Sequence, residues 1–321
     1  LSPSAMAEEP TAKAAHRAGQ TFITWQEVEG AKEYRVYRAA EAIRDLACAA
    51  CVGSVDEDST LNFRAAAGDI REEQQKKDMK RPPRPGRLPK RDLEVDDQLA
   101  AAREDPAYHF VIEPGGKPLG DDVGLFVYTA KKDQTAHYAV AASEKIVAAS
   151  GPVSERVAIP EPVPQGDERS YVHWVDDVGT AQYPAMGNRA SYAFNFVFVP
   201  SRQPGPRPLL ILPHARGGNY RIGHRNWRPG PPHVLVPDDD PWAPGDVKGR
   251  AAPYFTMWYG YNSHCGTGKP LTQGVNVNYT DRRLTWTIEW VRRRFEVDST
   301  RITMTGGSMG GIASVFQALR H

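Results

Sequence analysis

Short stretches in which polar and apolar residues alternate mark the first half of the chain. Thr21–Trp25 and Glu33–Arg38 show this pattern on either side of Gly30, and residues 124–128 and 137–141 repeat it around a polar turn. Alternation with a period of two is typical of half-buried strands, and a glycine between two such runs favours a hairpin. The first half is therefore predicted to be an all-β sandwich of short strands, with residues 21–25 and 33–38 forming a hairpin.

Longer apolar runs mark the second half. Tyr192–Val199, Leu209–Leu212 and His233–Val236 are predicted strands, and the uninterrupted run at 209–212 is typical of a strand covered on both faces. A proline-rich segment, 159–164, precedes them and predicts an extended linker over residues 159–184.

Two helices follow these strands in the predicted order of elements. The first is indicated by the helical spacing of four apolar residues, Leu284, Ile288, Val291 and Phe295. Asn278 or Thr280 would cap its start. After a turn at 298–299, residues 301–305 are predicted to form a strand. The second helix is indicated by Ile312, Val315, Phe316 and Leu319. Strands that alternate with helices predict a parallel sheet.

The last predicted strand runs directly into Gly306–Gly311 and then into the helix. Strand, Gly-x-Ser-x-Gly, helix is the context of a nucleophile elbow, a strained turn that projects the Ser308 hydroxyl above the sheet edge. Gly306 and Gly310 stand where a Cβ would collide as strand and helix pack closely, and the Met309 N–H starts the helix, aimed at a developing oxyanion. A plain Gly-rich turn or a phosphate loop is the alternative, but the Walker lysine and the Gly-x-Gly-x-x-Gly spacing are missing here.

These residues resemble the esterase-like branch of the α/β-hydrolases, whose members read strand, Gly-x-Ser-Met-Gly-Gly, helix. The resemblance covers about residues 185–321 and includes Pro213–Gly218, which is similar to the family's His-Gly-x-Gly-Gly loop. It implies that this loop supplies a second oxyanion N–H, from Arg216 or, as second choice, from Ala215. His214 would then orient the loop. Ala215 departs from the family pattern, in which this position is glycine.

The family's triad places its acid and its histidine after the serine. Only residues 309–321 follow Ser308, with no acid among them, and His321 lies more than about three helical turns along the predicted helix. We therefore expect the acid and the base to lie beyond the sequence given, so that this stretch alone is inactive. His224, His233 and His264 precede the serine and are interpreted as surface or core histidines.

The first half resembles a fibronectin type III domain over residues 14–158, after an N-terminal tail of residues 1–13. Residues 21–25, 34–38 and 138–140 are similar to strands B, C and F of that family. A charged, proline-containing insert near residues 65–105 separates strands C and F. Its composition favours a solvated or disordered arm over a polyanion site. The fold class expected is thus an all-β sandwich followed by the N-terminal part of an α/β-hydrolase domain, residues 185–321.

Composition and charge exclude some classes of function. Forty Lys and Arg against 39 Asp and Glu give a net charge of +1, which excludes a polycation that coats nucleic acid. The mean hydropathy is −0.54 and no long uncharged apolar run occurs, so no membrane span is predicted. Ala5–Ala7 resembles a secretory cleavage site, which predicts a secreted or periplasmic protein, and Ala-rich N-terminal sequence is the other interpretation.

A cysteine pair, an acidic run and a group of aromatic residues are further candidates for a metal, redox or substrate site. Cys48 and Cys51 have a metal or redox spacing, but a zinc site needs two more ligands nearby, so they are interpreted as small apolar residues. The acidic run 238–240 lacks the spacing of a calcium loop and is predicted to be a solvated loop. Aromatic residues are frequent in the sequence between the loop 213–218 and Ser308. They are interpreted either as walls of a substrate cleft or as buried connections between strands and helices: Trp227, Trp242, Tyr254, Phe255, Trp258, Tyr259 and Tyr261.

The sequence therefore predicts a serine hydrolase that cleaves carboxylic esters, small or polymer-linked, through an acyl-enzyme on Ser308 and without a cofactor. Two alternatives stay open. One is a serine peptidase of the prolyl oligopeptidase type. The other is an inactive hydrolase fold that binds polysaccharide or a surface together with the β-module.

Overall fold

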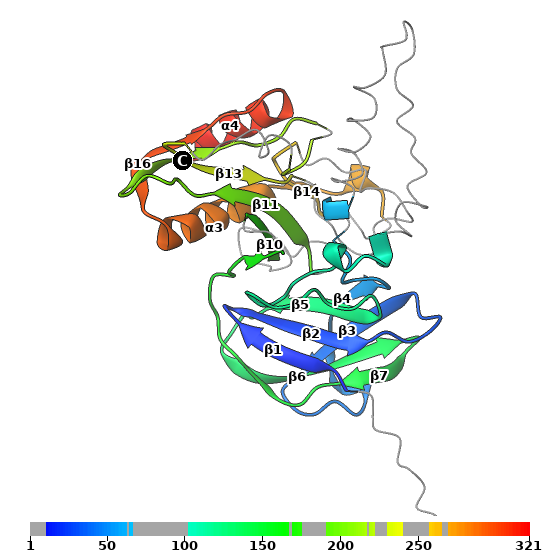
Figure 1. The fold of residues 1–321 in the computed structure, drawn as a ribbon. Coiled ribbons are helices and arrows are strands. Elements are labelled where there is room, and N and C mark those ends of the chain that lie inside the picture. The colour runs from blue at the N-terminus through cyan, green and yellow to red at the C-terminus, as the bar shows by residue number, and fades with distance from the viewer. Residues whose placement is uncertain are drawn as a thin grey trace, which may run out of the picture.

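The computed structural model describes residues 11–62, 64–66, 102–166, 169–174, 191–216, 218–221, 230–239, 257–264 and 269–321 (Figure 1). Several predictions concern residues outside these ranges: the cleavage-site motif 5–7, most of the charged insert, Cys265, Asp240, His224, and the aromatic residues Trp227, Trp242, Tyr254 and Phe255.

The described elements are mostly strands, with few helices. The first half holds β1 (Lys13–Arg17), β2 (Gln20–Gln26), β3 (Glu33–Ala39), β4 (Ala50–Asp56), β5 (Val123–Thr129), β6 (Gln134–Ala142), β7 (Lys145–Ala149) and β8 (Val153–Glu155). The second half holds β9 (Val163–Pro164), β10 (Ser170–Trp174), β11 (Ala193–Val199), β12 (Arg207–Ile211), β13 (His233–Pro237), β14 (Tyr261–Asn262), β15 (Asn276–Val277), β16 (Val297–Met304), α3 (Tyr279–Arg294) and α4 (Met309–Arg320). Short 3-10 turns occur at Leu46–Cys48, Pro106–Tyr108 and Leu271–Gln273.

Two antiparallel sheets form the predicted sandwich. One has the order β1-β2-β5, the other β4-β3-β6-β7, and β8 pairs with β6. Alternate residues of both sheets face a common core in which Trp25 packs against Tyr34, with their ring centroids 5.3 Å apart. That this sandwich belongs to the fibronectin type III family stays a prediction.

The predicted hairpin is wrong. β2 pairs with β1 and β5, whereas β3 pairs with β4 and β6, so the two strands lie in different sheets. The turn that contains Gly30 therefore crosses from one sheet to the other. β5 and β6, on either side of the later polar turn, are divided between the sheets in the same way. Alternation shows which residues face the core, but a strand has the same pattern whether its neighbour in sequence lies beside it or opposite it.

A six-stranded sheet forms the second half, in the order β16-β12-β13-β11-β10-β9. β12 runs parallel to β13 and to β16, while β9, β10 and β11 add antiparallel pairs, so the sheet is mixed and not parallel as predicted. The predicted linker is also wrong in part, because β9 and β10 fall within it. β16 already begins at Val297, so the predicted turn at 298–299 lies inside this strand, where its register with β12 shifts.

α3 confirms the predicted helix and its cap. The Asn278 side chain accepts a hydrogen bond from the Asp281 N–H at 3.1 Å, and the helix ends at Arg294 before the extended Phe295. Trp290 and Val291 pack on one face of the sheet against Phe198 and neighbouring strand residues. Leu284 of α3 joins Met309 and other residues of α4 in a separate cluster. The serine-bearing turn is thus supported by both helices.

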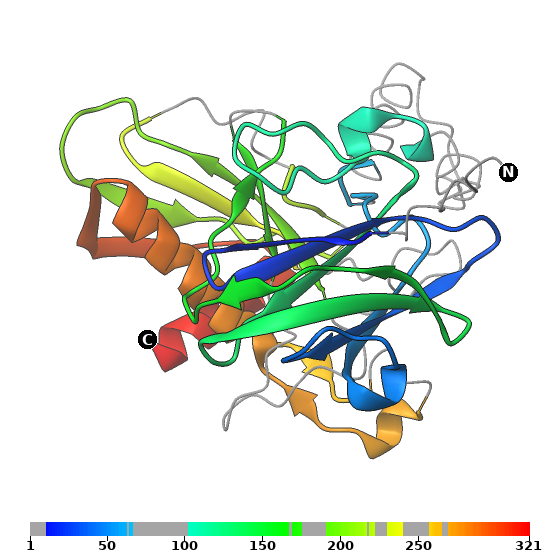
Figure 2. The ribbon, with the colours of Figure 1, turned by 90° about the horizontal axis from the view of Figure 1, so that it is seen from below.

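The sandwich packs directly on the second sheet, as Figures 1 and 2 show from two directions. Phe22 on the outer face of β2 contacts Trp174 of β10, with ring centroids 5.4 Å apart, in a shared apolar cluster. Asn62 and Asn195 exchange two buried amide hydrogen bonds, of 2.8 and 3.1 Å. The interface is therefore a second core and not a flexible join. None of the helices described is both long and apolar enough to span a membrane.

Candidate active site

Ser308 occupies the turn between β16 and α4. Its backbone has φ 51° and ψ −119°, and its side chain is exposed. A positive φ is strained for a residue with a Cβ, at a cost of roughly 1–3 kcal/mol, and such residues cluster at active sites. Ser308 is the N-cap of α4, yet its hydroxyl makes no capping hydrogen bond. The hydroxyl is therefore held outward, away from the backbone that it would ordinarily cap.

The glycines around Ser308 are required by close packing. A Cβ built on Gly306 would lie 2.7 Å from the Pro213 carbonyl oxygen, and one on Gly310 would lie 2.1 Å from the same atom. The added atom at Gly310 would also lie 3.2 Å from the His214 oxygen. Nothing lies within 4 Å of a Cβ built on Gly307. The predicted oxyanion loop and the predicted elbow are therefore in backbone contact through these two glycines.

The loop after β12 has a defined internal structure. The Gly218 N–H donates to the Ala215 carbonyl at 2.9 Å, and His214 Nδ1 donates to the same oxygen at 2.9 Å. Ala215 and Arg216 are exposed, whereas His214 is buried. On the other side of the site, Met309 is the first residue of α4, where the N–H has no acceptor within its own helix. Both predicted oxyanion donors thus belong to segments that meet at the elbow.

The acidic run is buried, and the prediction of a solvated loop is wrong. Asp238 and Asp239 are fully buried at the end of β13. Arg64 binds Asp238 through Nη2 to Oδ1 at 2.7 Å and Nε to Oδ2 at 3.1 Å, and His214 Nε2 lies 3.0 Å from Oδ1. Burial alone would raise the pKa of Asp238, but the Arg64 guanidinium and the His214 hydrogen bond hold it well below its usual range. Asp238 is therefore a buried carboxylate.

Trp258 completes the packing beneath the loop. Its indole N–H donates to the His214 carbonyl at 3.0 Å, and its ring lies edge-on to the His214 imidazole at 5.1 Å. Since Trp258 is buried, it supports the loop and does not line an open cleft. Tyr259 is half-buried and packs against Phe316 of α4.

The other described histidines that the sequence analysis singled out have structural contacts. His321 Nε2 lies 2.9 Å from Asp281 Oδ1. His233 Nδ1 accepts the Ser201 N–H, and His264 Nδ1 donates to the Pro270 carbonyl. Within the described part of the chain, no side chain hydrogen-bonds the Ser308 hydroxyl. In the same residues no group of three His, Cys, Asp or Glu could hold a metal ion, and Cys48 and Cys51 are exposed free thiols.

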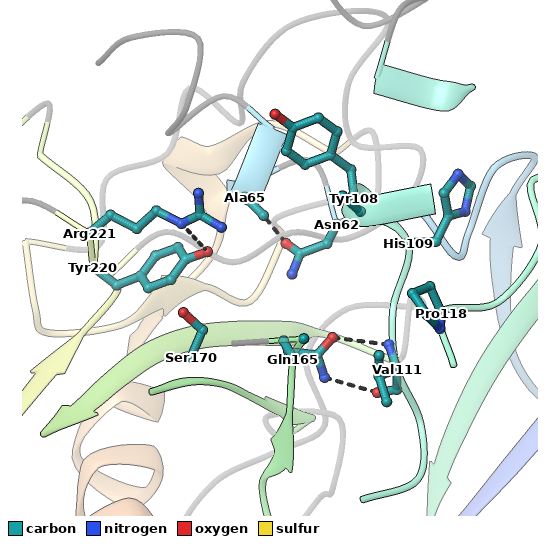
Figure 3. Close-up of a pocket in the computed structure, with 12 residues that line it drawn as sticks. Asn62, Ala65, Tyr108, His109, Val111, Pro118, Gln165, Ser170, Tyr220 and Arg221 are labelled. Carbon is teal, nitrogen blue, oxygen red and sulfur yellow. Dashed lines mark hydrogen bonds between the residues drawn. The ribbon is translucent and has the colours of Figure 1, made fainter. Parts of the chain in front are cut away.

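A pocket of about 310 Å³ opens between the sandwich and the second sheet (Figure 3). Asn62 and Tyr108 line it from the first half, and Ser170, Tyr220 and Arg221 line it from the second. The Arg221 Nε donates to the Tyr220 hydroxyl at 3.1 Å. Tyr220 and Arg221 follow the same loop whose beginning contacts Gly310. The described residues that line the pocket include one arginine and no acid.

The structure thus places the predicted residues Ser308, Met309, Gly306 and Gly310 together with the loop of Arg216 and Ala215. Sequence reasoning missed Arg64, which reaches the site from the first half, and the burial of Asp238. One signal was available, since Asp238 lies two residues after the carboxyl end of a predicted strand, and ligand sites gather at these ends in α/β sheets. No signal pointed to Arg64.

Comparison with known proteins gives weak likenesses. No family model matches the chain, and no curated protein matches its sequence. An S-formylglutathione hydrolase from Agrobacterium tumefaciens is 14% identical, with a TM-score of 0.31 over 50% of this chain and 56% of its own. An enterochelin esterase from Shigella flexneri is 11% identical, with a TM-score of 0.24 over 98% of this chain and 71% of its own. The chain spans little more than half the length of the first protein. Both scores are too low to support a family or an activity.

Proposed function

We propose that the protein is a serine hydrolase that cleaves carboxylic esters, with Ser308 as the nucleophile. The observation that supports this most directly is the strained, exposed conformation of Ser308 at a strand-to-helix turn. A Gly-rich turn with no catalytic role has no need for positive φ at a serine when glycine adopts that conformation without strain. The backbone contact of Gly306 and Gly310 with Pro213 also supports an oxyanion site between the two segments.

In the proposed reaction the Ser308 oxygen attacks the acyl carbonyl while a general base takes its proton. The N–H groups of Met309 and Arg216 then stabilise the tetrahedral oxyanion, because a helix N-terminus and a fixed loop amide are pre-aligned donors. The alcohol leaves with a proton, and water hydrolyses the acyl-enzyme by the same route. The proposal places the base and its orienting acid outside the described residues and requires no cofactor.

The substrate class follows from the pocket beside the loop. Its aromatic and amide groups and the Arg221 guanidinium suit an ester that carries an anionic or strongly polar substituent. We propose that this pocket holds the part of the substrate farthest from the scissile bond, whether a small molecule or the end of a polymer. Fibronectin type III identity and a secreted location stay predictions.

Labelling with a fluorophosphonate probe tests the nucleophile, using the full-length protein. We expect stoichiometric labelling, mapped by peptide mass spectrometry to Ser308 and abolished in Ser308→Ala. Ser299→Ala is the matched control, because Ser299 is an exposed serine on β16, the strand that leads to the elbow. It should label like the wild type.

A panel of p-nitrophenyl esters and prolyl peptides then separates esterase from peptidase activity. Absence of labelling on a folded full-length protein, or labelling that persists in Ser308→Ala, would refute the proposed nucleophile. Cleavage of peptides but not of esters would replace the esterase assignment with the peptidase alternative.

A further inference from the structure

A buried arginine of the first half reaches the site in the second half. Arg64 follows the sandwich strand β4, and its side chain is 7% exposed. Its guanidinium group binds both carboxylate oxygens of Asp238, which lies 174 residues later in the chain and is fully buried. Two parallel N–H···O bonds fix the position of the carboxylate as well as its charge. The placement of Asp238 therefore depends on a residue outside the second sheet.

Asp238 in turn contacts the histidine of the loop. His214 Nε2 lies 3.0 Å from Asp238 Oδ1 and 3.0 Å from the backbone nitrogen of Asp239. A protonated Nε2 donates to the carboxylate, and an unprotonated Nε2 accepts the amide hydrogen. The imidazole is held at this position in either state. Its other nitrogen, Nδ1, faces a carbonyl and therefore donates to it, at 2.9 Å from the Ala215 oxygen.

The direction of the Ala215 carbonyl fixes the direction of the next amide. The chain has no cis peptide bond among its described residues, so the Ala215–Arg216 peptide is trans and planar. In a trans peptide the N–H points opposite to the C=O. Because His214 and Gly218 hold the Ala215 carbonyl on the inner side of the loop, the Arg216 N–H points away from the imidazole. This N–H is the oxyanion donor of the proposed function.

We propose that Arg64 is a positioning residue for the oxyanion site. Through Asp238 and His214 it sets the plane of the Ala215–Arg216 peptide, so the sandwich half forms part of the catalytic framework of the other half. This proposal rests on the proposed function, because a directed Arg216 N–H matters only if an oxyanion forms beside Ser308. The stability of the ion pair does not explain it, since buried pairs often contribute no more than apolar residues of similar volume.

The experiment compares two arginines that each pair with a fully buried carboxylate, in the full-length protein. Arg64→Met removes the proposed link. Arg38→Met is the matched control, because Arg38 pairs with the fully buried Glu155 inside the sandwich, with no contact to the loop. Both variants leave a fully buried carboxylate without its arginine and should lose stability to a similar extent. We expect fluorophosphonate labelling of Ser308 to slow at least about 10-fold in Arg64→Met, in line with misdirection of one oxyanion donor.

Labelling is measured well below the unfolding temperature of each variant. Arg38→Met should then label at the wild-type rate. Arg64→Lys should label at a rate between those of Arg64→Met and the wild type, because lysine keeps the charge but cannot bind the carboxylate in a bidentate manner. Equal rates in Arg64→Met and wild type, or equal slowing in both methionine variants, would overturn the proposal.

Amide hydrogen exchange gives a readout that does not depend on the reactivity of Ser308. We expect faster exchange in peptides covering residues 213–218 in Arg64→Met and unchanged exchange there in Arg38→Met. Unchanged exchange in Arg64→Met would also overturn the proposal. If the wild type is not labelled while exchange responds as expected, the proposed function fails but the positioning of the loop by Arg64 stands.

Discussion

A single methyl group at Gly310 is expected to separate the oxyanion loop from the elbow. In Gly310→Ala the added Cβ would lie 2.1 Å from the Pro213 carbonyl oxygen, against 3.4 Å for an ordinary contact. The loop and the helix would have to move apart by about 1.3 Å. The atoms that the Cβ meets are backbone, and the position of a Cβ is fixed by its own backbone, so no side-chain rotation relieves the clash.

The magnitude follows from this displacement. Overpacking in a well-packed region typically costs about 1–3 kcal/mol, so the variant should still fold at moderate temperature. A misplacement of about 1 Å at a catalytic site reduces rates by roughly 100-fold. We therefore expect reactivity to fall far more than stability does. Reactivity would be lost because the Arg216 N–H and the Ser308 hydroxyl would no longer both face the carbonyl group under attack.

The assay is the rate of fluorophosphonate labelling at Ser308 in the full-length protein, beside the free energy of unfolding in urea. Gly307→Ala is the control, because a Cβ at that position meets nothing within 4 Å. It should leave the labelling rate unchanged. If Gly310→Ala labels as fast as Gly307→Ala while folded, the close approach of the loop and the elbow has no role in the reaction.

Three further predictions concern the interface, pH and the pocket. Asn62→Ala leaves the buried Asn195 amide unpaired and should lower the free energy of unfolding by about 1–3 kcal/mol, with a smaller added loss in the double variant with Asn195→Ala. Burial holds the pKa of His173 at about 3, so only the unfolded chain takes up its proton. The free energy of unfolding is therefore unaffected by this histidine above pH 6.5 and declines by up to about 1.4 kcal/mol per pH unit between pH 6.5 and about pH 3. Urea unfolding at several pH values should show a shallower dependence of this free energy on pH in His173→Asn. Arg221→Gln should raise KM about 10-fold for esters that carry a carboxylate and leave KM for neutral esters unchanged, and equal changes for both would contradict an anionic subsite.

Local sequence patterns predicted the parts of this molecule that local physics determines. Period-two alternation located β2 and β3, a long apolar run located β11, and the helical spacing with Asn278 located α3. The elbow was found because its chemistry requires glycine, serine and glycine at fixed spacing beside one another in sequence. None of these features depends on a distant residue.

The errors concern contacts between residues far apart in sequence. The pattern around Gly30 is the same for a hairpin and for a crossing between sheets, so pairing was mispredicted. The linker prediction followed from its prolines and overlooked the aromatic and β-branched residues in Ser170–Trp174, which favour a strand. Asp238 was predicted to be solvated because the acidic run lacks the spacing of a calcium loop. Arg64, which pairs with Asp238 in the structure, is separated from it by 174 residues, so no local pattern reveals the burial.

The shared cluster of Phe22, Trp174 and their neighbours has a practical consequence for recombinant work. Cutting the chain between the halves, near residue 159, would leave the outer face of β2 and β5 bare on one fragment and β10 bare on the other. Each fragment would expose a large apolar surface to water and would tend to aggregate. Protein made for crystallisation or screening should therefore keep both halves on one polypeptide, and co-expressed fragments should associate tightly enough to be purified together.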